Sequence, residues 1–143
     1  MSTPRTYFLI RHANAVDAPA FNGPRNERPL TEQGQEQAKA LAGKLSGLGI
    51  AAVYSSPATR CQQTAAHVAD KAGVEVIVKN GYLEGRSINL PEDHEVCAVV
   101  AHGDNIPALL DELGIQAHAC QTASAWKVEV DSSGQTSSSE YIV

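Results

Sequence analysis

The feature that most constrains this chain is an uninterrupted apolar run from Val96 to Ala101, which a histidine follows directly. A run of this length without polar alternation is typical of a parallel strand that is covered on both faces. Tyr7–Ile10 is a second such run, and Arg11 follows it. Because parallel strands need crossover connections, the sequence between these runs should contain helices. The two runs together predict an α/β fold.

Two segments have helical periodicity. The first is expected to begin after Thr31 as its cap and to end at Gly49. Its apolar residues recur every three or four positions: Ala38, Leu41, Leu45 and Leu48. The second is expected to begin with Ser56 as cap and Pro57 in its first position, and to end at Gly73. Its predicted buried stripe is Cys61, Ala65, Val68 and Ala72.

Short apolar segments predict the remaining strands. Ala51–Tyr54 and Val74–Val78 flank the second predicted helix, and a helix with Pro107 in its first turn should end at Gly114. The C-terminal part predicts an antiparallel hairpin from these segments: Trp126–Val130, a turn at Asp131–Gly134, and Tyr141–Val143. We therefore predict a single-domain, three-layer α/β/α fold over residues 1–143, with a mostly parallel central sheet and an antiparallel C-terminal hairpin strand.

Composition excludes several classes of protein. A net charge of −5 and a pI near 5.4 disfavour nucleic acid or an anionic membrane as the main partner, since both require a basic face. Met1–Arg5 carries no apolar leader, and the apolar runs are too short to span a bilayer. The three cysteines lack a CxxC spacing, which predicts neither a disulfide framework nor a zinc site. A cytoplasmic location is expected, and the oligomeric state stays open.

Basic side chains follow the predicted strands at the point where each strand ends. Arg11 and His12 follow the run Tyr7–Ile10, and His102 follows the run Val96–Ala101. Arg60 lies just inside the predicted helix that follows the strand Ala51–Tyr54. In open parallel sheets, ligands bind outside the carboxyl ends of the strands. Arginine grips phosphoryl oxygens through a fixed, permanently charged fork. The sequence therefore predicts a pocket for a phosphoryl group.

Four segments resemble the histidine phosphatase superfamily, which includes phosphoglycerate mutases and the small bacterial phosphohistidine phosphatases. These segments are Leu9–Ala13, Arg28–Gly34, Tyr54–Thr64 and Val99–Gly103. The resemblance implies that His12 is the nucleophile and that Arg11, Arg60 and His102 bind the phosphoryl group together with it. Among the family, the compact chain looks most like the phosphohistidine phosphatases.

The chemistry fits these residue types. A neutral imidazole at His12 attacks phosphorus and forms a phosphohistidine, which water then hydrolyses. Positive charge from Arg11 and Arg60 should help to keep His12 neutral and should stabilise the transferring group. We expect no metal and no cofactor. Glu84 lies where relatives carry an acidic residue, and a raised pKa would suit it as general acid. Asp104 is the rival candidate.

Two features depart from the family pattern. Ala13 stands where the family usually has glycine, and the stretch from Lys79 to Glu95 lacks the helix that many relatives place there. A phosphatase acting on a phosphomonoester or phosphohistidine, in a small molecule or a phosphoprotein, is the function expected. The alternatives are a phosphoglycerate mutase-like phosphotransferase and a catalytically inactive phosphate-recognition module. The core motif does not identify the natural substrate.

Overall fold

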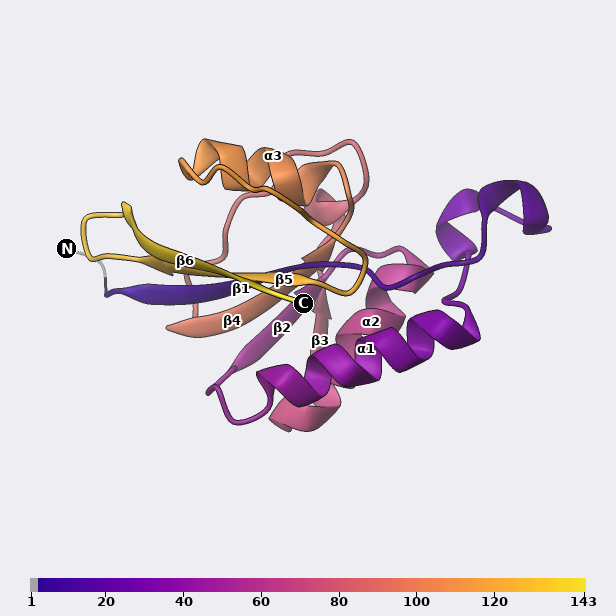
Figure 1. Ribbon diagram of the computed structural model, residues 1–143, viewed down its shortest axis with the longest axis horizontal. Helices are drawn as coiled ribbons and strands as arrows, with labels where there is room; N and C mark the ends of the chain where they lie inside the picture. The colour runs from indigo at the N-terminus through magenta and orange to yellow at the C-terminus, as the bar shows by residue number, and fades with distance from the viewer. Residues whose placement is uncertain (1–2) are drawn as a thin grey trace.

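The sheet of this protein has six strands within residues 3–143, the part of the chain that the computed structural model describes. Met1 and Ser2, where the sequence was expected to carry no leader, lie outside the described residues. The strands are β1 (Arg5–Arg11), β2 (Ala52–Ser55), β3 (Val76–Val78), β4 (Val96–Ala101), β5 (Ala125–Val130) and β6 (Thr136–Ile142). Their order in the sheet is β3-β2-β4-β1-β5-β6 (Figure 1).

Pairing in the sheet is parallel except at the C-terminal hairpin. β3, β2, β4 and β1 pair in parallel, whereas β5 pairs antiparallel with both β1 and β6. Three α-helices cover the sheet: α1 (Glu32–Leu45), α2 (Thr59–Ala72) and α3 (Asn105–Glu112). α3 lies on one face, and α1 and α2 lie on the other (Figure 1). The predicted three-layer α/β/α fold with its antiparallel hairpin is confirmed.

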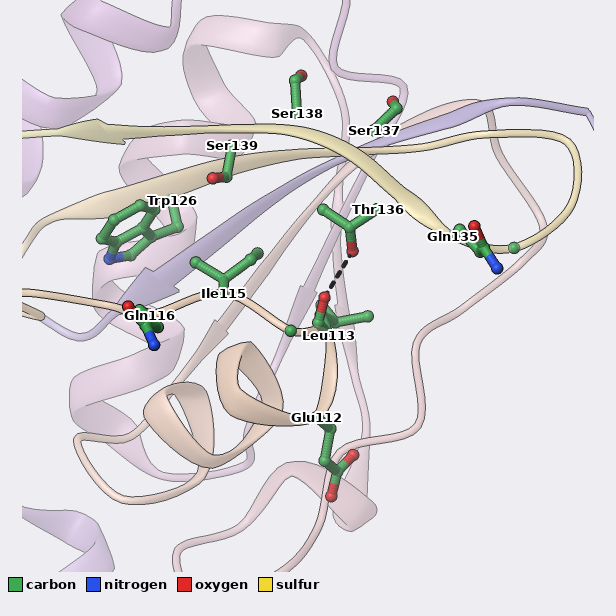
Figure 2. Close-up of a pocket in the computed structure, with 12 residues that line it drawn as sticks. Glu112, Leu113, Ile115, Gln116, Trp126, Gln135, Thr136, Ser137, Ser138 and Ser139 are labelled. Atoms are coloured by element: carbon green, nitrogen blue, oxygen red, sulfur yellow. Dashed lines mark hydrogen bonds between the residues drawn. The ribbon is translucent and has the colours of Figure 1, made fainter.

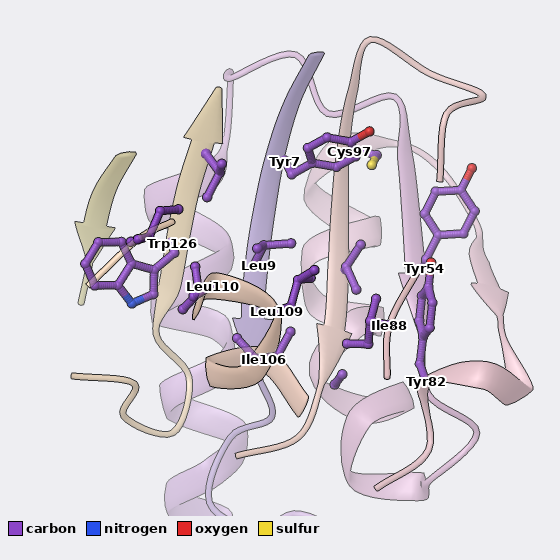
Figure 3. Packing of buried hydrophobic residues seen from close by; sticks show 14 of the residues in the cluster. Tyr7, Leu9, Tyr54, Tyr82, Ile88, Cys97, Ile106, Leu109, Leu110 and Trp126 are labelled. Atoms are coloured by element: carbon purple, nitrogen blue, oxygen red, sulfur yellow. The ribbon is translucent and has the colours of Figure 1, made fainter. Parts of the chain in front are cut away.

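The central strands are buried on both faces, as their continuous apolar runs predicted. In β1, Tyr7 and Leu9 belong to the hydrophobic cluster under α3, and Phe8 and Ile10 belong to the cluster under α1 and α2. Figure 3 shows that α3 directs Ile106, Leu109 and Leu110 onto the face of the sheet that carries Leu9. Because successive strand residues point to opposite faces, each apolar run supplies both clusters at once.

The first helix begins as predicted but ends early. Thr31 caps α1 by accepting a hydrogen bond from the Gly34 backbone N–H at 3.0 Å. The helix ends at Leu45 rather than near Gly49, because Gly47 adopts a left-handed conformation with φ of 79°. Leu48, predicted to lie on the buried stripe, is 44% exposed as a consequence.

The start of the second helix was predicted too early. α2 begins at Thr59, and its N-cap Ala58 makes no side-chain capping bond. The hydroxyl of Ser56, predicted to cap the helix, lies 2.9 Å from a ring nitrogen of His102. A distant side chain therefore contacts the oxygen that local sequence assigned to the helix end.

The connection from β3 to β4 is irregular, as the absence of helical period between Lys79 and Glu95 predicted. It contains one short 3-10 helix, η3 (Asn80–Tyr82), and no α-helix. Two further 3-10 turns, η1 (Ala18–Ala20) and η2 (Arg25–Glu27), lie in the long loop after β1. No helix within residues 3–143 is long and apolar enough to cross a membrane.

Candidate active site

The two strand-end histidines lie side by side. β1 and β4 are adjacent, and Arg11 pairs with Ala101, so the next residues are His12 and His102. Their rings are 5.6 Å apart between centroids, with an interplanar angle of 70°. The helices that follow these strands, α1 and α3, cover opposite faces of the sheet (Figure 1). This is the reversal point at which ligands bind in open α/β sheets.

His12 is held in one tautomer by a backbone contact. Its Nδ1 lies 2.7 Å from the carbonyl oxygen of Ala13. A carbonyl can only accept, so Nδ1 carries the proton, and Nε2 of the neutral ring carries the free electron pair. Burial lowers the pKa of His12 to about 4; the bond to Ala13 opposes this, and the charges of Arg60 and Arg11 add to it. The arginines were expected to keep His12 neutral, and burial proves the larger cause.

The backbone around His12 is fixed from three sides. Ala13, fully buried, donates its N–H to the Thr64 hydroxyl of α2 at 2.9 Å. Ala123 donates to the carbonyls of Arg11 and His12 from a left-handed conformation with φ of 56°. At Gly34, an added Cβ would lie 2.0 Å from a backbone oxygen of the loop after His12. The helix α1 can therefore pack against this loop only because residue 34 has no side chain.

Arg60 and Arg11 supply the positive charge of the site. Arg60 is 1% exposed, and its Nη2 lies 3.2 Å from Nδ1 of His102. Arg11 donates from Nη1 to the Cys120 carbonyl at 3.0 Å. The Nε atoms of both arginines are buried without an acceptor among the described protein groups; Arg5, at the start of β1, is the third arginine with this property.

His102 is engaged through both ring nitrogens. Because a guanidinium always donates, Nδ1 accepts from Arg60, and Nε2 then carries the proton that it donates to Ser56 Oγ at 2.9 Å. Burial, followed by the charge of Arg60, lowers the pKa of His102 to about 4. Neighbouring Cys61 has its Sγ 3.6 Å from Nε2, and burial raises the pKa of this thiol to about 12. His102 is therefore neutral near pH 7.

Glu84 lies at the site but is not in the protonation state that was expected. Both of its carboxylate oxygens accept from Arg25, at 3.0 and 3.1 Å, and Oε1 is also 3.4 Å from Arg60 Nη2. The hydrogen bonds from Arg25 lower the pKa of Glu84, whereas a raised pKa was expected for a general acid. In its rival, Asp104, Oδ1 accepts from the Asn105 N–H and Oδ2 from the Gly85 N–H, each at 2.7 Å.

Three residues that contact the site were not found by sequence reasoning. Ser56 was assigned to a helix cap, and Arg25, in the long loop after β1, was not among the predicted site residues. Asn105 was not singled out, although it is 4% exposed and uses both ends of its amide. It accepts from the His102 N–H at 2.9 Å and donates to the Tyr82 carbonyl at 3.0 Å. An asparagine three residues after a strand-end histidine was the signal available.

Elsewhere, the C-terminal end of α3 and β6 enclose an open groove of about 920 Å³. Figure 2 shows Ile115, Trp126 and Thr136 among the residues that line this groove. The Thr136 hydroxyl donates a hydrogen bond to the Leu113 carbonyl at 2.9 Å. None of the candidate catalytic residues lines this groove. Within residues 3–143, no three His, Cys, Asp or Glu side chains are grouped as metal ligands would be.

Sequence comparison finds a family and similarity to named proteins. The model of the histidine phosphatase superfamily (branch 1) matches residues 7–86. The probable phosphoglycerate mutase GpmB of Enterobacter sp. (strain 638) is 31% identical over 96 residues, which are 62% of this chain and 45% of that protein. GpmB of Yersinia pestis (strain Pestoides F) is 31% identical over 128 residues, which are 78% and 59%. The chain thus spans about half the length of the curated relatives it matches.

Solved structures share the fold over nearly the whole chain. The protein histidine phosphatase SixA, complexed with tungstate, has a TM-score of 0.84 and 23% identity, and 96% of each chain is covered. The mycobacterial glucosyl-3-phosphoglycerate phosphatase has a TM-score of 0.67 and 14% identity, again with 96% of each chain covered. At these identities the likeness establishes the fold.

Proposed function

The chain belongs to the histidine phosphatase superfamily, and from that premise we propose that it is a phosphatase that hydrolyses a phosphomonoester or a phosphohistidine through a covalent phosphohistidine at His12. One observation carries the proposal. The His12 ring is neutral, with Nδ1 bound to a carbonyl and the electron pair on Nε2, and the charges of buried Arg60 and partly buried Arg11 act on it. A nucleophile and a binding site for its anionic target are thus adjacent.

The arginines support the binding of a phosphoryl group. Buried N–H groups are almost always paired, and the Nε atoms of Arg11 and Arg60 have no acceptor among the described protein groups. A phosphoryl group would offer several oxygens to these two donors. The similar SixA structure holds tungstate, which is also a tetrahedral oxyanion. We propose that Arg11, Arg60, His12 and His102 surround the phosphoryl group.

The proposed reaction has two steps. The electron pair on Nε2 of His12 forms the N–P bond while the bond from phosphorus to the leaving group breaks, and the leaving group takes that electron pair. Water then attacks the phosphohistidine, and His12 regains its electron pair. Arg11 and Arg60 stabilise the charge on the phosphoryl oxygens in both steps, so we propose that no metal ion is needed.

Glu84 is our candidate for proton exchange with the leaving group and with water. Its carboxylate lies 3.4 Å from Arg60 Nη2, whereas both oxygens of Asp104 already accept backbone N–H groups. Ionised Glu84 suits the second step, in which a base accepts a proton from the attacking water. Its part in the first step depends on the ion pair that it forms with Arg25.

Two other functions compete with hydrolysis. A phosphoglycerate mutase-like transferase would agree with the GpmB relatives, but the aligned chain covers only about half of their length. A recognition module without catalysis would need the arginines but not a neutral histidine with a free electron pair. The three cysteines are unpaired, which suits a reducing compartment such as the cytoplasm.

The proposal is tested by trapping the phosphoenzyme. The protein is mixed with a labelled aryl phosphate in EDTA and denatured in alkali, because a phosphohistidine is stable to base and labile to acid. We expect an adduct in the wild type and in His94→Ala, a histidine outside the site, and none in His12→Ala. Phosphate binding without any adduct or turnover would overturn the proposal and favour the recognition module.

A further inference from the structure

Arg25 and Glu84 form a two-pronged ion pair at the site. Arg25 Nε lies 3.0 Å from Oε1, and Nη2 lies 3.1 Å from Oε2. The two residues are 59 positions apart and come from different loops, η2 after β1 and the segment after η3. The pair is partly exposed, with 56% of the Arg25 side chain and 37% of the Glu84 side chain accessible. Both carboxylate oxygens of Glu84 are therefore occupied by one guanidinium.

The backbone of Arg25 is itself anchored to the site. Nη1 of buried Arg60 lies 3.4 Å from the Arg25 carbonyl and 3.4 Å from Oδ1 of Asn26. Arg60 also reaches Glu84 through its other terminal nitrogen, at 3.4 Å. The same buried arginine thus contacts both members of the pair, which keeps the η2 turn over the site.

The charges around Glu84 favour its ionised form. The hydrogen bonds and the charge of Arg25 lower its pKa most strongly, the charge of Arg60 adds to this, and partial burial opposes it. A carboxylate that accepts two N–H groups of one guanidinium cannot donate a proton through either oxygen while the pair persists. Asp104 offers no substitute, since both of its oxygens accept backbone N–H groups.

We propose, building on the phosphatase function above, that Arg25 determines substrate specificity: by gripping both oxygens of Glu84, it prevents proton donation to the leaving group. The chain then acts on phosphoryl donors whose leaving group departs without a proton from the protein. Aryl phosphates, acyl phosphates and phosphoramidates belong to this class, and simple alkyl phosphates do not.

The reaction balances without an acid from the protein. His12 Nε2 supplies the electron pair of the new N–P bond, and the broken bond leaves its pair on the departing oxygen or nitrogen. An aryl or carboxylate oxygen is stable as the anion, and a phosphoramidate already protonated on its leaving group departs neutral. An alkoxide is too basic to depart alone, so an alkyl phosphate requires a general acid in this step.

The variant Arg25→Gln tests the proposal through a ratio of substrates. The kcat/KM for ethyl phosphate is divided by that for p-nitrophenyl phosphate. Once Arg25 is gone, the bound phosphoryl dianion should raise the pKa of Glu84, as a neighbouring like charge does. General acid catalysis raises the rate of such a step by about 100-fold or more. Partial protonation of Glu84 at about pH 6 should therefore raise the ratio about five-fold or more. Any general loss of substrate affinity cancels in the ratio.

Two variants serve as controls. Arg86→Gln removes the same charge at an exposed position two residues from Glu84, where the Arg86 side chain forms no ion pair within residues 3–143, and it should leave the ratio at the wild-type value. Arg25→Gln combined with Glu84→Gln should lose the gain, because the proton donor is missing. A gain in Arg25→Gln that depends on Glu84 supports the proposal.

The proposal is overturned by an Arg25→Gln ratio equal to that of the wild type, or by an equal gain in the double variant. Trapping of the wild-type phosphoenzyme is measured first. An adduct at His12 together with an unchanged ratio rejects only the role of Arg25. Absence of both adduct and turnover in the wild type rejects the phosphatase function, and the role of Arg25 with it.

Discussion

Some single positions in this site have no room for a larger side chain, and Gly103 is the clearest case. A Cβ added at Gly103 would lie 2.8 Å from Arg11 Nε and 2.9 Å from its Cζ. These atoms belong to the guanidinium itself, so a side chain at this position would push the guanidinium out of its place. The residue after His102 must therefore lack a side chain if Arg11 is to keep its position.

Gly103→Ala should displace the Arg11 guanidinium and weaken phosphate binding. Loss of a hydrogen bond to a charged group costs about 1.5–3 kcal/mol, so KM for an aryl phosphate should rise about ten-fold or more. Steady-state kinetics measure this change. Gly81→Ala is the matched control, because nothing lies within 4 Å of a Cβ added there. An unchanged KM in Gly103→Ala would show that Arg11 does not need its observed position.

At the scale of elements, the first residue of α3 joins three parts of the fold. Asn105 accepts from the His102 N–H at the end of β4 and donates to the carbonyls of Tyr82 and Leu83. These carbonyls lie just before Glu84 in the irregular β3–β4 connection, which has one short 3-10 helix and no α-helix. One buried amide thus fixes the loop of Glu84 relative to the strand of His102.

Asn105→Ala should destabilise the fold and loosen the Glu84 loop. It leaves a buried N–H and two carbonyls without their partner, which costs about 1–3 kcal/mol in the free energy of unfolding. Urea unfolding measures this loss, and Asn89→Ala, an exposed asparagine of the same connection, should cost far less. Equal losses in the two variants would contradict this account of Asn105.

For the whole molecule, two neutral histidines next to buried arginines tie stability to pH. The pKa of His102 is about 4 in the folded protein and 6.5 as its ordinary value. The unfolded chain therefore binds more protons between these two values, and stability falls as the pH is lowered through this window. The contribution of neutral His102 is complete above the window.

His102→Gln should flatten this dependence. The wild type should lose about 2 kcal/mol more than the variant when the pH falls from neutral to about 5, since the variant keeps His12 but lacks the second buried imidazole, at position 102. Urea unfolding at the two pH values gives the difference for each protein. His94→Gln, outside the site, should behave as the wild type does. Parallel losses in wild type and His102→Gln would refute the linkage.

The sequence by itself determined the fold class and the edge of the sheet at which His12 and His102 meet. The runs Tyr7–Ile10 and Val96–Ala101 are strands because continuous apolar residues satisfy both faces of a covered sheet. Parallel pairing brings the carboxyl ends of these strands together, so the positions of His12 and His102 in the chain sufficed to predict that they meet. The pattern of apolar residues that predicts a strand lies within the strand itself and continues along its whole length. The chemical roles of these residues stay predictions.

Only the tertiary structure decided which group each polar side chain contacts. Ser56 could have capped a helix, but its hydroxyl binds His102, which is 46 positions away. Glu84 could have had a raised pKa, but an arginine 59 positions away occupies both of its oxygens. Crossover connections and irregular loops bring such partners together in space. The sequence of these segments has no periodicity from which the distance between the partners could be predicted. A side chain's own sequence context sets what it can bind, and the packing of the layers sets what lies within its reach.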